Sequence, residues 1–81
     1  MKVNLLFFAV LRDITGSDAR ELTLDTGSTP RQVWESLRSS YSKLADYTQP
    51  PMVAINETYA SPDDPLHDGD ELAFIPPVAG G

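Results

Sequence analysis

The final two residues, Gly80 and Gly81, have the most clearly defined chemistry in the sequence. Glycine has no side chain, so this backbone can enter a narrow channel that other residues would block. A terminal carboxylate has a pKa of about 3.5 and is ionised at neutral pH, where it resists nucleophilic attack. Once activated, for instance as an acyl-adenylate, the unhindered Gly81 carbonyl would accept a sulfur, oxygen or nitrogen nucleophile. Residues 77–81 reach roughly 17 Å when extended, enough to deliver Gly81 into a partner's buried site.

Other residue types with possible chemistry form weaker patterns. His67, the single histidine, has no evident serine or cysteine nucleophile beside it, so we expect a surface side chain. The helix residue Trp34 is expected in the core. The glycines before the tail are isolated, which excludes a phosphate-binding loop. Five acidic residues lie close together in the sequence: Asp63, Asp64, Asp68, Asp70 and Glu71. Their spacing favours structural turns over a metal site.

The composition excludes several classes of protein. The chain has 81 residues, enough for one domain, and its net charge is −6. Its few lysines and arginines are scattered, which disfavours binding to nucleic acid or to an anionic membrane. Without cysteine it has no disulfides, thiolate nucleophiles or thiolate metal ligands. No segment approaches the roughly 20 apolar residues of a membrane span, so we expect a cytoplasmic protein.

The elements that must position this terminus begin and end with apolar strands. Lys2–Val10 is predicted to be a strand, and residues 71–75 are the last strand before Pro76 and Pro77. Both faces of the first strand are apolar: Val3, Leu5 and Phe7 on one, Leu6 and Phe8 on the other. This strand is therefore either covered on both faces or open to a partner on the second.

The central part of the sequence predicts one helix between shorter strands. Residues 12–19 are expected to be a loop, and residues 21–25 a strand with Leu22 and Leu24 facing inward. Thr29-Pro30-Arg31-Gln32 is a helix-start pattern, and the helix should run from Pro30 to Tyr41 or slightly beyond. The remaining segments are a buried strand (residues 52–55), a short returning strand (59–60) and a loop (61–70) anchored by Leu66.

The order strand, strand, helix, strand, short strand, strand predicts an α+β domain with the helix on one sheet face. The first and last strands are the most apolar, so we place them side by side at the centre of the sheet. This arrangement is the β-grasp, or ubiquitin-like, fold. We expect residues 1–76 to form the domain and residues 77–81 a flexible tail.

Several blocks of residues follow the pattern of one known family, and the last block is the most specific. They are Leu6-Phe7-Phe8-Ala9, Leu11-Arg12, Thr29 to Leu37, Val53-Ala54-Ile55-Asn56, Pro65-Leu66, Asp68 to Leu72, and Ala73-Phe74-Ile75-Pro76-Pro77-Val78 with Gly80-Gly81. Across nearly the whole chain the sequence resembles the small, sulfur-carrier subunits of molybdopterin synthase, ubiquitin-like proteins of molybdenum-cofactor biosynthesis.

The resemblance implies a carrier that is not catalytic alone. An ATP-dependent activating enzyme would adenylate Gly81, and a sulfur donor would convert the acyl-adenylate to a thiocarboxylate. The Gly80-Gly81 end would then enter the large synthase subunit, in a heterotetramer, and give its sulfur to cyclic pyranopterin monophosphate. We expect no cofactor and no metal bound to the chain, since ATP is consumed by the activating enzyme.

The resemblance also implies an interface on the sheet face away from the helix, unless surface loops cover that face. Arg12, beside it, would pair with a partner carboxylate. The expected interface residues are Leu6, Phe8, Tyr59, Ile75, Pro76, Pro77, Val78 and Ala79. Two alternatives use the same Gly-Gly chemistry, a carrier for thiamine biosynthesis and a ubiquitin-like modifier. A third is a non-catalytic β-grasp interaction module with an inert tail.

Overall fold

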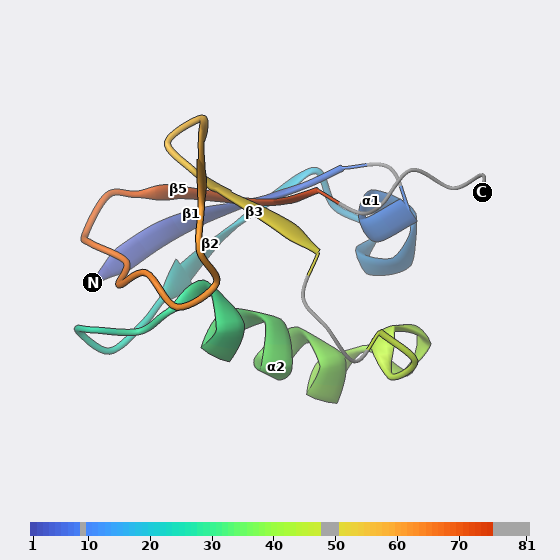
Figure 1. Ribbon diagram of the computed structural model, residues 1–81. Coiled ribbons are helices and arrows are strands. Elements are labelled where there is room, and N and C mark those ends of the chain that lie inside the picture. The colour runs from blue at the N-terminus through green and yellow to red at the C-terminus, as the bar shows by residue number, and fades with distance from the viewer. Residues whose placement is uncertain (9, 48–50, 76–81) are drawn as a thin grey trace.

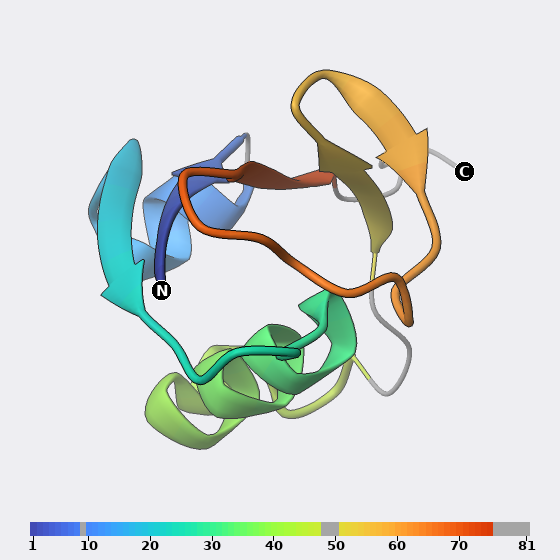
Figure 2. The same cartoon turned by 90° about the vertical axis from the view of Figure 1, so that its left-hand side faces the viewer.

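The computed structural model describes residues 1–8, 10–47 and 51–75, and these residues are built on one mixed sheet (Figures 1 and 2). Its strands are β1 (Lys2–Phe7), β2 (Ala19–Thr23), β3 (Met52–Ile55), β4 (Thr58–Ala60) and β5 (Glu71–Ile75). The helices are α1 (Val10–Thr15), α2 (Pro30–Ser40) and the 3₁₀ helix η1 (Ser42–Leu44).

The strand order β2-β1-β5-β3-β4 places β5 in the middle of the sheet. β1 and β5 are parallel neighbours, and all other pairs are antiparallel. This confirms that the first and last strands lie side by side at the centre. With α2 covering one face of the sheet (Figure 1), the predicted α+β, β-grasp fold is confirmed.

The core lies between α2 and the sheet face to which alternation directs Val3, Leu5 and Phe7. Trp34 of α2 is fully buried, and its ring centroid lies 5.1 Å from that of Phe74 in β5. The prediction of Trp34 as a core residue is therefore confirmed. The remaining buried hydrophobic residues of the core include Leu11, Val33, Leu37, Leu44, Val53, Leu66 and Leu72.

The start of α2 follows from its capping residues. The Gln32 N–H donates to Thr29 Oγ1 at 3.4 Å, and the Thr29 N–H donates to Gln32 Oε1 at 3.0 Å. These two bonds form a capping box, and Pro30 occupies the first turn, where its missing N–H costs nothing. The Tyr41 N–H donates to the Leu37 carbonyl at the other end. The predicted helix is thus confirmed to within one residue.

The segment after β1 differs from the prediction, because the strand ends at Phe7 and a short helix replaces the expected loop. The Phe8 carbonyl accepts from the Leu11 N–H at 3.0 Å, which turns the chain out of the sheet. Leu11 is buried and Ile14, three residues on, packs against the core on the same side of α1. Gly16, with φ of +75°, ends this helix.

Smaller differences concern the strand bounds and the tail. β2 spans Ala19–Thr23 rather than residues 21–25, although Leu22 and Leu24 do pack against the core as expected. The predicted buried strand at residues 52–55 is confirmed as β3, but Met52 at its start is 56% exposed because alternation points it away from α2. The predicted tail, residues 77–81, and the domain boundary at residue 76 lie outside the described residues.

Candidate functional site

The sheet face opposite α2 carries a row of apolar side chains across four strands. In the pairing register, Leu6 of β1 lies beside Ala73 of β5, Ala73 beside Ala54 of β3, and Ala54 beside Tyr59 of β4. Cross-strand neighbours project to the same face, so these four side chains form one continuous line. Two small alanines lie in the middle of this line, between the larger Leu6 and Tyr59.

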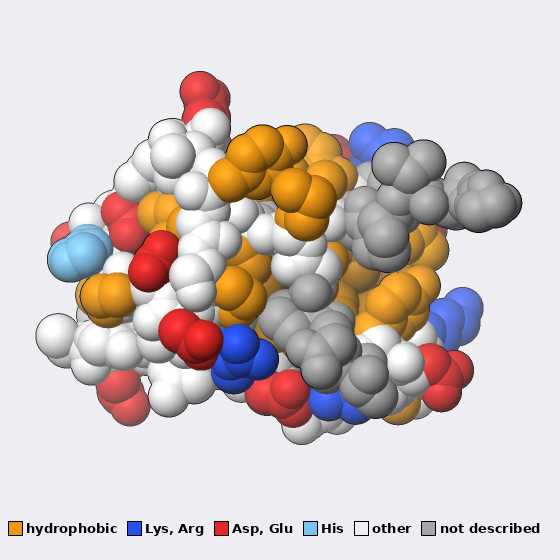
Figure 3. Space-filling view, in the orientation of Figure 1, with side chains coloured by type: hydrophobic (Ala, Val, Ile, Leu, Met, Phe, Trp, Pro, Cys, Tyr) orange, Lys and Arg blue, Asp and Glu red, His pale blue; other side chains and the backbone are white. Residues whose placement is uncertain are grey.

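A second apolar row follows toward the ends of β1 and β5. Ile75 pairs with Met52, and Phe8 lies one residue beyond the last β1–β5 pair, level with Ile75. We call the two rows together the outer face; it comprises Leu6, Phe8, Met52, Ala54, Tyr59, Ala73 and Ile75. Figure 3 shows hydrophobic side chains gathered on the upper side of the molecule, over the sheet and away from α2.

Exposure of its larger side chains distinguishes the outer face from the core, while the two alanines in its middle, Ala54 and Ala73, are buried. Tyr59 is 68% exposed and Phe8 46% exposed, whereas the alternate residues of the same strands are buried under α2 or face away from this side. Leu6 and Ile75 are half-buried. Such a contiguous group of large apolar side chains in water is typical of a protein interface. Among the described residues no loop covers Tyr59, Met52 or Phe8.

Arg12, expected beside this face, lies on α1. Its Nε is 3.6 Å from Asp18 Oδ1, and both side chains are largely exposed. An exposed pair of this kind contributes little to stability and can exchange partners readily. The structure therefore places Arg12 within the chain's own ion pair, in a position open to solvent.

The acidic residues between β4 and β5 hold the loop together. The Asp70 carboxylate accepts from the His67 N–H at 2.8 Å and from Asn56 Nδ2 at 2.9 Å, and these bonds lower its pKa from the ordinary value. Asp68 accepts from the Lys2 N–H at 2.7 Å, while Asp63 pairs with Arg31. The predicted structural role of this cluster is confirmed, and His67 is exposed as expected.

The described part of the chain contains neither a metal-binding cluster nor a membrane-spanning helix. No group of three or more His, Cys, Asp or Glu residues there could hold a metal ion. No helix in those segments has the length and apolar character needed to cross a membrane. The two residues with the clearest predicted chemistry, Gly80 and Gly81, lie outside the described residues, as do Pro76, Pro77, Val78 and Ala79.

Sequence reasoning missed two members of the exposed apolar surface. Met52 lies in a segment predicted to be a buried strand, because all four of its residues are apolar and no polar residue marks an open face. Val10, at the start of α1, is 39% exposed near the end of β1. The sequence did not indicate this exposure, because the first strand was predicted to extend to Val10.

Comparison with known proteins identifies the family. The ThiS family matches residues 5–81. The molybdopterin synthase sulfur carrier subunit of Escherichia coli is 41% identical, covering 98% of this chain and 99% of that protein. That of Mycobacterium tuberculosis is 37% identical, covering 100% and 99%. The solved structure of SAMP1 from Haloferax volcanii superposes with a TM-score of 0.81 at 25% identity, covering both chains fully. The chain therefore belongs to the ThiS family and, by its full-length relatives, to the molybdopterin synthase sulfur carrier subunits.

Proposed function

We propose that this chain carries sulfur on the carboxyl carbon of Gly81 and gives it to cyclic pyranopterin monophosphate. The observation that carries the proposal is the full-length match to relatives named molybdopterin synthase sulfur carrier subunits. The Gly80-Gly81 sequence supplies a carbonyl that no side chain hinders. The folded domain that precedes this terminus then provides the surface that partner proteins bind.

The chemistry of the terminus requires activation first. A Gly81 carboxylate oxygen attacks the α-phosphorus of ATP on the activating enzyme, which releases pyrophosphate and leaves an acyl-adenylate. A sulfur donor then displaces AMP, so that one carboxyl oxygen is replaced by sulfur. The thiocarboxylate sulfur then bonds to a carbon of the pterin precursor and displaces an oxygen substituent from it. Water attacks the Gly81 carbonyl and cleaves the carbonyl–sulfur bond, which leaves the sulfur on the pterin and restores the carboxylate. The carrier itself needs no cofactor in this series of reactions, because the activating enzyme binds and consumes the ATP.

We propose that the outer face docks the carrier on the large synthase subunit. Its support is the exposure of Tyr59, Met52 and Phe8 together with the half-buried Leu6 and Ile75. Because β5 ends at Ile75 on this face, a partner bound here lies close to the point where residues 76–81 begin. Pro76, Pro77, Val78 and Ala79 would then lead Gly81 into the partner, and Arg12 would exchange Asp18 for a carboxylate of the partner.

The test of the sulfur chemistry uses intact-mass spectrometry with the activating enzyme, ATP and the sulfur donor. We expect the full chain to gain the mass difference of one oxygen replaced by sulfur, and a chain lacking Gly81 to show no change. Thermal unfolding of the two chains should agree, because Gly81 lies beyond the last strand. Sulfur transfer by the truncated chain at the rate of the full chain would contradict the proposal.

A protein modifier is the second candidate, since SAMP1, the small archaeal modifier protein, shares the fold. A modifier would form an isopeptide bond between Gly81 and a lysine of another protein. Covalent conjugates in a cell extract containing ATP, with no thiocarboxylate detected, would favour the modifier. A thiocarboxylate consumed by the large subunit, with formation of the dithiolene product, would favour the synthase subunit.

A further inference from the structure

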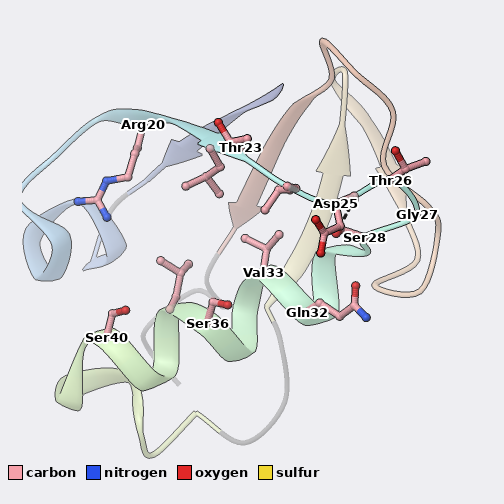
Figure 4. A pocket seen from close by; sticks show the side chains of 13 residues that line it. Arg20, Thr23, Asp25, Thr26, Gly27, Ser28, Gln32, Val33, Ser36 and Ser40 are labelled. Carbon is pink, nitrogen blue, oxygen red and sulfur yellow. Dashed lines mark hydrogen bonds between the residues drawn. The ribbon is translucent and has the colours of Figure 1, made fainter. Parts of the chain in front are cut away.

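A groove of about 680 Å³ lies between β2 and α2 (Figure 4), and so on the side of the sheet that faces α2. Its apolar lining comes from Leu22 and Leu24 on the β2 side and from Val33 and Leu37 on α2. Hydroxyl and amide side chains border these residues, among them Thr23, Thr26, Ser28, Gln32, Ser36 and Ser40. A volume of this size is in the range of sites that hold a ligand.

One wall of the groove is the edge of the sheet as the described residues form it, because among those residues β2 pairs only with β1. Met1 and Leu24 exchange backbone hydrogen bonds of 2.8 Å each, and the Phe7 N–H donates to the Asp18 carbonyl at 2.8 Å. In an antiparallel ladder the residues that bond the neighbouring strand alternate with those that point away. The N–H and C=O groups of Ala19, Glu21 and Thr23 therefore point outward, toward solvent.

The groove has a positively charged end and a negatively charged end. Arg20 lies at one end and Asp25 at the other (Figure 4). Arg20 donates to the Tyr41 hydroxyl at 2.8 Å and sits 5.9 Å from the centre of that ring, and within the described chain no carboxylate lies within ion-pair distance of it. Arg20, Leu22 and Leu24 alternate with the outward-pointing residues, so all three side chains share the groove side of β2.

We propose that the β2 edge binds an extended peptide segment of a partner protein, which adds a strand to the sheet and places an acidic side chain at Arg20. Backbone groups of Ala19, Glu21 and Thr23 pair with the peptide, as in other cases of strand addition. Apolar side chains at the alternate peptide positions enter the groove beside Leu22 and Leu24. An acidic residue is attracted at the Arg20 end and repelled at the Asp25 end, which sets the direction of the bound segment.

A second copy of this chain fits the same edge less well. In a symmetric antiparallel pair of β2 strands, the groove-facing positions of the second copy would again be Arg20, Leu22 and Leu24. With Leu22 at the centre of that pair, Leu24 of the second copy lies opposite Arg20 and its Asp25 lies one residue farther along, so the carboxylate is not aligned with Arg20. Charge complementarity thus selects a partner segment with an acidic residue over self-association.

The test is a titration of isotope-labelled full-length protein, followed by amide chemical shifts. The probes are acetyl-TDTVTVT-amide and its reversal, acetyl-TVTVTDT-amide, which alternate valine and threonine and place aspartate at opposite ends. We expect one of the two to shift the amides of Ala19, Glu21 and Thr23 at millimolar concentration. Replacing its aspartate by lysine should weaken binding about fivefold, the equivalent of about 1 kcal/mol for one exposed charge pair.

Two pairs of matched variants test whether the peptide binds at the β2 edge and in the groove. Ser36 lines the groove whereas Ser39, also exposed on α2, does not, so Ser36→Trp should abolish the shifts and Ser39→Trp should retain them. Thr23→Pro removes an outward N–H that β1 does not use and should weaken binding, whereas Thr23→Val should not. Ser36→Trp keeps the test decisive if the proline variant fails to fold.

Three results would overturn the proposal. The first is that neither peptide shifts the β2 amides. The second is equal binding of the aspartate and lysine peptides. The third is a concentration-dependent shift of the same amides in the protein alone, which would assign the edge to a second copy. None of these measurements involves Gly81 or the large subunit, so their outcome is independent of the sulfur-carrier proposal.

Discussion

Replacing Tyr59 by alanine should weaken binding to the large synthase subunit far more than it weakens the fold. Taking roughly 200 Å² for a tyrosine, its 68% exposure leaves about 135 Å² available to a partner. At about 25 cal/mol per Å² this area corresponds to about 3.4 kcal/mol if the partner covers it fully. Allowing for incomplete burial, we expect a loss of about 2–3 kcal/mol, which raises Kd roughly 30- to 150-fold.

The stability of the same variant follows from the part of Tyr59 already buried. That part, about a third of the side chain, is worth at most about 1.5 kcal/mol, since burial measured against an extended chain is an upper bound. The melting temperature should therefore fall by no more than about 10 °C. Calorimetric titration gives Kd, and thermal unfolding gives the stability.

Thr58→Ala is the matched control, because Thr58 is exposed on the same strand but faces the other side of the sheet. Thr58→Ala should leave Kd unchanged and should change the free energy of unfolding by no more than about 0.5 kcal/mol. If Tyr59→Ala leaves Kd within about twofold of the wild-type value while the melting temperature falls, the outer face is not the docking surface.

Three further predictions concern the folded chain alone, measured by thermal or urea unfolding. Glu57→Gly should stabilise the protein by about 1 kcal/mol, because Glu57 has φ of +69°, a conformation costly for any residue with a Cβ; Glu57→Ala, which keeps the Cβ, should bring no such gain. Thr29→Ala should destabilise it by about 1 kcal/mol through loss of the bond from the Gln32 N–H, whereas Thr29→Ser keeps the cap and should cost much less. The pKa of Asp70 is lowered in the fold, mainly by the bond from the His67 N–H, so its stabilising contribution is present above the unfolded value of about 4 and is lost as the pH falls through the folded pKa. Asp70→Asn should therefore lower stability at pH 6 and flatten its decline between pH 5 and pH 2; an unchanged acid profile would contradict this.

Most of the fold could be predicted because its determinants are local. The Thr29–Gln32 capping box specifies where α2 begins using only four residues. Alternation in β1 separated Val3, Leu5 and Phe7 from Leu6 and Phe8, and the family resemblance indicated that Leu6 and Phe8 lie on the face away from the helix. The neighbouring positions of β1 and β5 follow from their shared apolar character, since the central strands of a sheet are the most deeply covered.

The missed features depend on contacts between distant segments or on very short elements. α1 is six residues long, and Val10-Leu11 continues the apolar run of β1, so periodicity alone cannot separate strand from helix there. The groove between β2 and α2 arises from how two segments lie in space, and no local pattern encodes its volume. Met52 belongs to a strand of only four residues, too short for its alternation to stand out.

The middle strand of the sheet is the last of the five described strands in chain order, and therefore the last of them to be synthesised. β1 and β3 have no contact in the sheet until residues 71–75 insert between them, and one of the two new pairings is parallel. Such long-range pairing is slow to form, because the chain between the partners must first be closed into a loop. A chain interrupted before residue 71 therefore lacks the strand that joins β1 and β2 to β3 and β4, so the sheet can be completed only after residues 71–75 have been added.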